Sequence, residues 1–313
     1  MFSVFTSTLT PLLTMFFCIV IGYALKKANL LPDNANVVLS KLETYVLLPA
    51  VNITSFMTYC NVQSLVAHRY LVLTSVILIA VAVGLSYPLS KIFHKDGYQR
   101  NIYKYAMTFG NYGFLGNAIV PVILGEEALF TYLLFTMPLS AVCHTWGVSQ
   151  LIPRGKQKGA ALKRLLNPSM ISISVGIILG LTGAKAIMPS FLTMALSNLK
   201  ACMGPVAMVL TGFVVAKYNL GSLLKMPRVY LASLFRLIIL PAIYIAALLL
   251  LKVDKSIVIM ALFAFATPLG LNTVVFPSAH GADPSTGASM ALISHTLGIF
   301  TIPLLYAVVT YLL

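Results

Sequence analysis

Polar and helix-breaking residues interrupt two apolar segments of this 313-residue chain, at residues 110–121 (GNYGFLGNAIVP) and 268–277 (PLGLNTVVFP). Each interruption lies near the middle of a stretch long enough to cross a bilayer, where freed backbone groups must line a cavity. We expect half-helices to begin near Ala118 and Thr273, with Asn117 and Asn272 as N-cap residues. Their unpaired N–H groups and positive dipole ends would bind a carboxylate without a buried Lys or Arg.

Further polar residues of these segments complete the predicted anion site. The alternative for each Asn is that it caps a broken helix and does not touch a ligand. Arg236 has two interpretations: it binds the second carboxylate of a diacid, or it pairs with a backbone carbonyl at a helix end, which is favoured. The predicted substrate-binding residues are Asn111, Gly116, Asn117, Asn272, Thr273 and Arg236.

A few ionisable residues within apolar segments are candidates for proton coupling. Glu43 and Lys200 occupy the same register in two similar segments. They either face each other across the pseudo-twofold axis or each snorkel to their own interface, which is favoured; if buried, Glu43 is the best coupling carboxylate. His295 and His144 could titrate, but a lone His in a packed segment is more often a structural hydrogen-bonder. Glu43 and His295 are therefore the proton-coupling candidates. The spacing of Cys and His residues predicts no metal or cofactor.

Composition places the chain among integral membrane proteins. It is 59% hydrophobic and 9% charged, with a mean hydropathy of +0.94, whereas soluble domains are about 25% charged. The apolar runs lack the period-two alternation of barrel strands, so we expect helices. The net charge of +14 lies in short loops and not in one stripe, which disfavours a nucleic-acid partner.

Ten helical spans are predicted from the apolar runs, in two halves that resemble each other. They cover residues 5–26, 37–58, 68–92, 100–124, 127–151, 168–184, 190–216, 228–251, 256–280 and 284–312. Spans 2 and 7 share a pattern, as do spans 4 and 9, so residues 1–152 and 168–313 form a 5+5 inverted repeat, the pattern of a secondary carrier. Helix breaks are expected at Gly113, Pro121, Pro268, Gly270, Pro277, Pro49 and Pro205.

Basic residues predict the orientation of the chain in its membrane. Loops after odd-numbered spans carry most of the Lys and Arg, whereas those after even-numbered spans carry Arg69, Lys185, Lys252 and Lys255. Because cytoplasmic loops are enriched in basic residues, we expect a cytoplasmic loop at 153–167 and both termini outside. The lipid bilayer is the surrounding partner.

Several motifs together resemble the auxin efflux carrier family, which includes the plant PIN proteins and bacterial malate and malonate permeases. The short central loop is closer to the bacterial members, which implies a multi-pass protein of the inner (cytoplasmic) cell membrane. The motifs are Gly22-Tyr23 with Lys26-Lys27, Leu39-Ser40-x-Leu42 with Leu47-Leu48-Pro49, Asn111-x-Gly113-Phe114-Leu115-Gly116, Asn167-Pro168, Pro189 with Pro205 and Gly212, and Pro268 with Asn272 before Gly281-x-Asp283.

The resemblance implies an all-α fold related to the bile acid sodium symporters, in which spans 4 and 9 break and cross. It also implies a scaffold of spans 1, 2, 6 and 7 that forms a homodimer, a moving transport part of spans 3–5 and 8–10, and elevator-type transport. By position, Asn111 corresponds to the Asn that contacts the substrate carboxylate in PIN proteins. The family's usual Pro at each crossing is replaced near Asn117 and at Thr273.

These observations predict a secondary active or potential-driven carrier of small organic anions, such as malate, malonate, lactate or an auxin-like acid, with H+ as a coupling ion. One alternative is a sodium-coupled symporter of a larger amphipathic anion, although the centres of spans 4 and 9 hold no acidic residue. Another is a membrane sensor that binds a sterol or lipid and transports nothing. We expect no enzymatic activity, because no nucleophile, base and orienting group cluster in the sequence.

Overall fold

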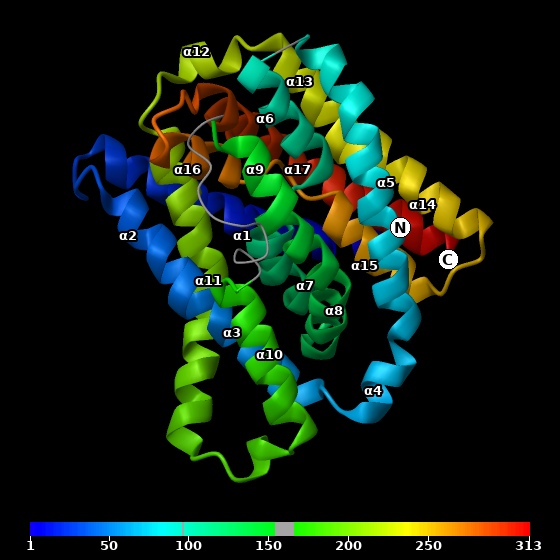
Figure 1. Ribbon diagram of the computed structural model, residues 1–313. Coiled ribbons are helices and arrows are strands. Elements are labelled where there is room, and N and C mark those ends of the chain that lie inside the picture. Colours follow the sequence, from blue (N-terminus) through cyan, green and yellow to red (C-terminus); the bar gives the residue numbers. More distant parts are fainter. Residues whose placement is uncertain (96, 154–165) are drawn as a thin grey trace.

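A computed structural model describes residues 1–95, 97–153 and 166–313, and this part of the chain is built from helices (Figure 1). Within the described residues, seven helical segments are long and apolar enough to cross a bilayer. They are α1 (Phe2–Lys27), Ala35–Tyr59, α5 (Arg69–Phe93), Glu126–Leu151, α11 (Ser190–Val215), Pro227–Leu250 and α17 (Ser285–Leu312). The predicted all-helical, multi-pass membrane class is thus confirmed.

The other predicted spans correspond to shorter helices. The sixth is α10 (Pro168–Leu181), and the fourth and ninth are each divided in two. The fourth consists of α6 (Gly97–Thr108) and the helix Tyr112–Leu124, and the ninth of α15 (Lys255–Phe265) and α16 (Asn272–Ala279). Most of the predicted 153–167 loop lies outside the described residues. Short helices occupy other connections: α4 (Val62–Ala67), a 3₁₀ turn at Ala184–Ala186, and α12 (Leu220–Leu224).

Turns of π-helix lie inside four of the membrane segments that the structure describes. They join α2 (Ala35–Leu42) to α3 (Leu48–Tyr59), α8 (Glu126–Val142) to α9 (Val148–Leu151), and α13 (Pro227–Leu234) to α14 (Leu240–Leu250), and one at Tyr112–Gly116 opens α7 (Asn117–Leu124). Gly113 lies in the last of these, and Pro49 closely follows the π turn Glu43–Leu47. Proline cannot donate a backbone hydrogen bond, which locally disturbs the helical ladder. Such turns often mark functional regions of a helix.

The two interrupted spans touch at their breaks. Gly110 and Leu269 form an antiparallel bridge, and the Asn111 N–H donates to the Pro268 carbonyl at 2.6 Å. The Ser294 hydroxyl of α17 accepts the Leu269 N–H at 2.8 Å. Backbone groups freed by the breaks therefore satisfy one another, as buried backbone must at this depth.

Only some of the predicted helix breaks are found. Pro268 and Gly270 lie in the interruption between α15 and α16. Pro121, Pro277 and Pro205 lie inside α7, α16 and α11, which continue past them, so a break there is wrong. The helical segments Tyr112–Leu124 and Ala35–Tyr59 likewise continue past Gly113 and Pro49, with a π turn in place of a break. A Pro removes one N–H and can bend a membrane helix without ending it when neighbouring groups satisfy the freed carbonyl.

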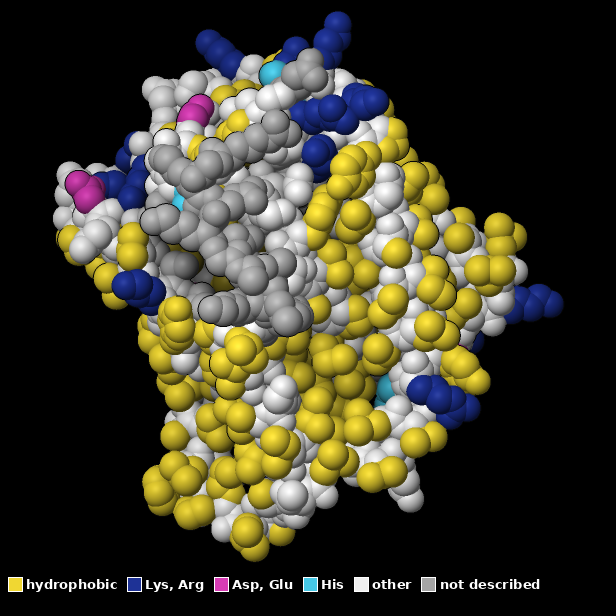
Figure 2. All heavy atoms as spheres, in the orientation of Figure 1, with side chains coloured by type: hydrophobic (Ala, Val, Ile, Leu, Met, Phe, Trp, Pro, Cys, Tyr) yellow, Lys and Arg dark blue, Asp and Glu magenta, His cyan; other side chains and the backbone are white. Residues whose placement is uncertain are grey.

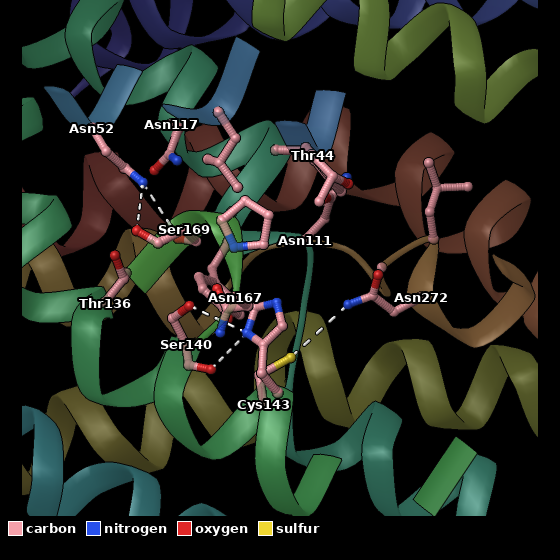
Figure 3. Close-up of a pocket in the computed structure, with 18 of the residues that line it drawn as sticks. Thr44, Asn52, Asn111, Asn117, Thr136, Ser140, Cys143, Asn167, Ser169 and Asn272 are labelled. Atoms are coloured by element: carbon pink, nitrogen blue, oxygen red, sulfur yellow. Dashed lines mark hydrogen bonds between the residues drawn. The ribbon is translucent and has the colours of Figure 1, made fainter. Parts of the chain in front are cut away.

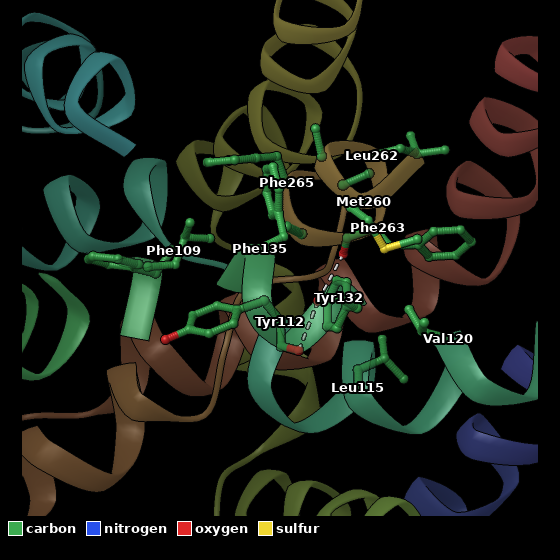
Figure 4. Packing of buried hydrophobic residues seen from close by; sticks show 14 of the residues in the cluster. Phe109, Tyr112, Leu115, Val120, Tyr132, Phe135, Met260, Leu262, Phe263 and Phe265 are labelled. Carbon is green, nitrogen blue, oxygen red and sulfur yellow. Dashed lines mark hydrogen bonds between the residues drawn. The ribbon is translucent and has the colours of Figure 1, made fainter. Parts of the chain in front are cut away.

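Aromatic side chains pack beside the crossing. Tyr132 and Phe135 of α8 pack with Phe263 and Phe265 of α15 in one buried cluster (Figure 4). The Tyr132 hydroxyl lies 3.0 Å from the Tyr112 carbonyl and 3.3 Å from the Phe263 carbonyl, so one side chain bridges both interrupted spans.

The outer surface is largely apolar. Figure 2 shows hydrophobic side chains over most of the visible face, with Lys and Arg gathered at the end that carries α12 and the start of α13. An apolar belt with charge toward one end is what a bilayer and the positive-inside rule require.

Two glycines let α1 and α11 approach closely along their lengths. A Cβ on Gly212 would overlap the Ile19 carbonyl oxygen, and a Cβ on Gly22 would overlap the Val209 carbonyl oxygen. Small residues at such contacts allow the backbones of membrane helices to pack against each other.

We therefore expect Gly212→Ala to force α1 and α11 apart and to destabilise the protein by about 1–3 kcal/mol, the usual cost of overpacking. The matched control is Gly84→Ala in α5, because a Cβ there has nothing within 4 Å. That control should be neutral or stabilising, since Ala favours helix by about 0.5–1 kcal/mol over Gly. Melting temperatures of the purified protein in detergent measure both. Equal melting temperatures for the two variants would show that the close contact does not matter.

Candidate functional site

A cavity of about 200 Å³ lies beside the crossing of the two interrupted spans (Figure 3). Amide and hydroxyl side chains line it together with apolar ones, and among the described lining residues none is Asp, Glu, Lys or Arg. Its polar side chains come from four spans and the start of α10: Ser40, Thr44, Asn52, Asn111, Tyr112, Asn117, Thr136, Ser140, Cys143, His144, Asn167, Ser169 and Asn272. The site is thus polar and uncharged.

Two helix N-termini meet at this cavity. The helix Tyr112–Leu124 begins with Asn111 in the N-cap position, and α16 begins at Asn272. The predicted start of α16 is right to within one residue, although Asn272 is its first residue and not its N-cap. The first half-helix begins at Tyr112 and not near Ala118. The bridge at Gly110 ends the irregular segment earlier than expected, so Asn117 lies inside the helix. Neither Asn111 nor Asn117 forms a side-chain cap. The first N–H groups at each start carry positive partial charge.

Asn111 joins the cavity to His295 of α17. The Asn111 amide nitrogen lies 3.1 Å from His295 Nε2, and His295 Nδ1 lies 2.7 Å from the Ala291 carbonyl oxygen. A carbonyl only accepts, so Nδ1 carries the proton and, in the neutral ring, Nε2 accepts the Asn111 N–H. His295 does not itself line the cavity but positions a residue that does.

Asn272 is held by a second polar chain. Its amide donates to the Tyr105 hydroxyl at 2.8 Å, and that hydroxyl lies 3.2 Å from the Cys143 sulfur. Asn111 and Asn272 are therefore oriented by partners on α17 and α6, and both side chains lie at the cavity (Figure 3).

Asn117 also lines the cavity, but one of its polar atoms is unsatisfied. The residue is 5% exposed, and its Oδ1 has no hydrogen-bond partner among the described residues. Asn52 of α3 also has a buried Oδ1 without a partner among the described residues, although its amide nitrogen donates to the Ser172 hydroxyl at 2.9 Å. A buried carbonyl oxygen without a donor costs about 1–3 kcal/mol, so Asn117 is poised for a partner that is not part of the protein.

Gly116 and Thr273 are not brought to the cavity. Gly116 gives room to Tyr132, whose hydroxyl a Cβ at residue 116 would overlap. Thr273 is fully buried, and its hydroxyl donates to the Gly270 carbonyl at 2.9 Å. Both residues pack near the starts of the half-helices but do not line the cavity.

Arg236 lies at the opposite, carbonyl ends of the broken helices. It is fully buried and donates to the Thr108 carbonyl at 3.2 Å and to the Ala264 carbonyl at 3.5 Å. These carbonyls end α6 and α15, where the helix dipoles are negative and the last acceptors are unpaired. Of the two interpretations weighed for Arg236, the geometry corresponds to pairing at a helix end.

The prediction that Glu43 snorkels to an interface is wrong. Its side chain is 0% exposed, and neither carboxyl oxygen has a hydrogen-bond partner among the described residues. The π turn that begins at Glu43 turns this side chain inward, while Ser40 and Thr44 on the same span face the cavity. Lys200 forms an ion pair with Glu126 instead of facing Glu43.

Spans 2 and 5 also contribute polar residues to the cavity that were not predicted from the sequence. On span 2, Ser40, Thr44 and Asn52 recur at multiples of four, and on span 5, Thr136 and Ser140 do the same. A polar stripe at helical spacing in an apolar span was the available signal.

Replacing Arg236 with Met should leave the carbonyl ends of α6 and α15 without a donor and destabilise the protein by about 3–5 kcal/mol. Arg236→Lys should recover part of this, because an ammonium group cannot span both carbonyls as a guanidinium does. Arg69→Met at the exposed start of α5 is the control, with an expected change within about 0.5 kcal/mol. Melting temperatures in detergent should decrease from Arg69→Met through Arg236→Lys to Arg236→Met. Equal melting temperatures for Arg236→Met and Arg69→Met would contradict this role.

The whole chain also matches a described protein family. A family model described as Membrane transport protein matches residues 7–306, which includes both interrupted spans and every residue of the cavity. Among curated protein sequences, none matches the chain. The motif resemblance found in the sequence is confirmed by this match, and the chain belongs to the membrane transport protein family, that of the auxin efflux carriers.

Proposed function

We propose that this membrane transport protein is a carrier of small organic anions, mono- or dicarboxylates such as malate, malonate or lactate. One observation carries the proposal: two broken helices present their N-termini and the side chains of Asn111 and Asn272 to one uncharged polar cavity. Helix N-termini and amide donors stabilise a carboxylate without a buried cation.

An uncharged site suits a carrier better than a permanent binding pocket. A buried Lys or Arg would hold a carboxylate through a charge-assisted bond, about twice as strong as a neutral one. Partial charges at helix ends bind more weakly and allow release. Arg236 stabilises the crossing from behind without adding its full charge to the cavity lining.

The size of the cavity favours a small ligand. Its volume of about 200 Å³ is below the roughly 300–1,000 Å³ of sites for drug-sized molecules. This supports a short carboxylate over the alternative of a larger amphipathic anion coupled to sodium, and over a sterol.

The proposed architecture is the ten-span 5+5 inverted repeat with both termini outside and the 153–167 loop in the cytoplasm of a cell membrane. The packing of α1 along α11 and of α3 along α10 supports a scaffold built from spans 1, 2, 6 and 7. Elevator-type movement of the other spans, and a homodimer through the scaffold, remain predictions from the family.

Proton coupling would follow from the contact between Asn111 and His295. In the neutral ring, Nε2 takes an Asn111 N–H, which leaves the amide oxygen for the cavity. When Nε2 gains a proton it becomes a donor, so the Asn111 amide must turn its oxygen to His295 and its NH2 group toward the cavity. The side chains of Leu12, Met15 and Phe16, in the small cavity next to His295, are apolar. Anion binding and His295 protonation would then favour each other.

The main test is uptake of labelled malate by the purified protein in liposomes, with membrane potential and pH and sodium gradients imposed separately. We expect Asn111→Ala with Asn272→Ala to reduce uptake at least tenfold, because each amide supplies a hydrogen bond to a charged ligand, worth about 1.5–3 kcal/mol. Asn198→Ala, on an exposed position of α11, is the control and should transport like the wild type.

The outcomes separate the alternatives. If malate does not move but another carboxylate raises the melting temperature, the substrate is wrong and the site stands. If uptake requires a sodium gradient, the sodium symporter replaces the proton-coupled carrier. If no anion binds or moves under any gradient, transport of anions is refuted and the lipid sensor becomes the better hypothesis.

Coupling is tested by His295→Gln. An inward gradient of one pH unit is worth about tenfold in accumulation for one coupled proton, and we expect this gain in the wild type but not in His295→Gln. His68→Gln is the control and should keep the gain, because His68 is not among the described lining residues and its Nδ1 bonds to the Ser64 carbonyl. If His295→Gln still accumulates more malate under the pH gradient and Glu43→Gln does not, proton coupling belongs to Glu43.

A further inference from the structure

A second cavity, of about 330 Å³, lies between α7 and α11 on the other side of Asn117. Asn117 lines both this cavity and the one at the crossing. Its Oδ1 is one of the buried side-chain oxygens that lack a hydrogen-bond partner among the described residues. Asn117 is thus part of the partition between the two cavities.

The partition is closed by direct contact between two helices. A Cβ on Gly204 of α11 would lie 2.6 Å from the Ala118 Cβ of α7, so the helices touch next to Asn117. The lining of the second cavity includes Glu126, at the start of α8. Small residues at the contact allow the two helices to pack closely.

An ion pair lies at the outer part of this second cavity. Lys200 of α11 pairs with Glu126, and the Lys side chain is 14% exposed whereas the Glu side chain is 54% exposed. The cation is therefore held in the cavity wall, and its partner is a carboxylate that is largely in water. An exposed ion pair contributes little, so another carboxylate can replace Glu126 at small cost.

We propose that this second cavity is a carboxylate subsite, which an anion occupies on the side of the crossing opposite the first cavity. There the Lys200 ammonium group exchanges Glu126 for a carboxylate of the substrate, and Asn117 lies on the path between the two sites. This inference rests on the proposed anion transport and adds a route and a residue to it. The charge of the site stays balanced, because Glu126 moves into water when the anion arrives.

The test compares malate uptake from the two faces of the membrane, in vesicles sorted by orientation. Lys200→Gln should raise the KM for malate about tenfold at the face that carries Glu126 and leave the KM at the other face unchanged, since it removes one charge-assisted bond. Glu126→Gln should lower the KM at that face, because a competing carboxylate is gone. Glu127→Gln, on the exposed neighbouring residue, is the matched control and should match the wild type.

A charge swap distinguishes a subsite from a mere latch between helices. Lys200→Glu combined with Glu126→Lys keeps an ion pair but places a carboxylate in the cavity wall. We expect the KM of this double variant at the Glu126 face to be raised as in Lys200→Gln. Lys200→Arg keeps a cation in the cavity wall and should have a KM close to that of the wild type. Wild-type kinetics for the swap, or for Lys200→Gln, would overturn the subsite. Absence of malate transport in the wild type itself would instead refute the proposed function.

Discussion

The hydrogen bond from Asn111 N–H to the Pro268 carbonyl fixes the crossing on which the rest of this structure depends. Breaking two helices at membrane depth frees carbonyls on one side and N–H groups on the other, and no lipid group can pair with them. Arg236 satisfies carbonyls at the ends of α6 and α15. The N-termini that begin at Tyr112 and Asn272 face a cavity instead. The crossing thus has a satisfied negative side and an open positive side.

That asymmetry explains the chemistry of the site. The buried guanidinium stabilises the protein without lining the cavity, which presents amides, hydroxyls and helix ends. Their orientation comes from more distant groups: His295 bonds to Asn111, and Tyr105 bonds to Asn272. Such indirect support keeps the polar side chains of the cavity in place.

Sequence pattern predicted the helical class, the positions of the spans and the two interruptions, because apolar run length and Gly, Asn and Pro placement are local properties. It also selected Asn111, Asn117 and Asn272, which all line the cavity. It misplaced the start of the first half-helix, because the bridge at Gly110 is a contact between distant segments. It placed Glu43 at an interface because no pattern of single residues reveals a π turn, which here turns the carboxyl group inward.

The most direct test of the central claim is a crystal structure of the protein bound to 2-bromosuccinate, a dicarboxylate whose bromine gives an anomalous signal. If the crossing is the anion site, the bromine peak lies in the cavity, with a carboxylate in hydrogen-bond reach of Asn111 and Asn272. A peak elsewhere in the protein, with this cavity empty, would contradict the claim that two helix N-termini form the substrate site.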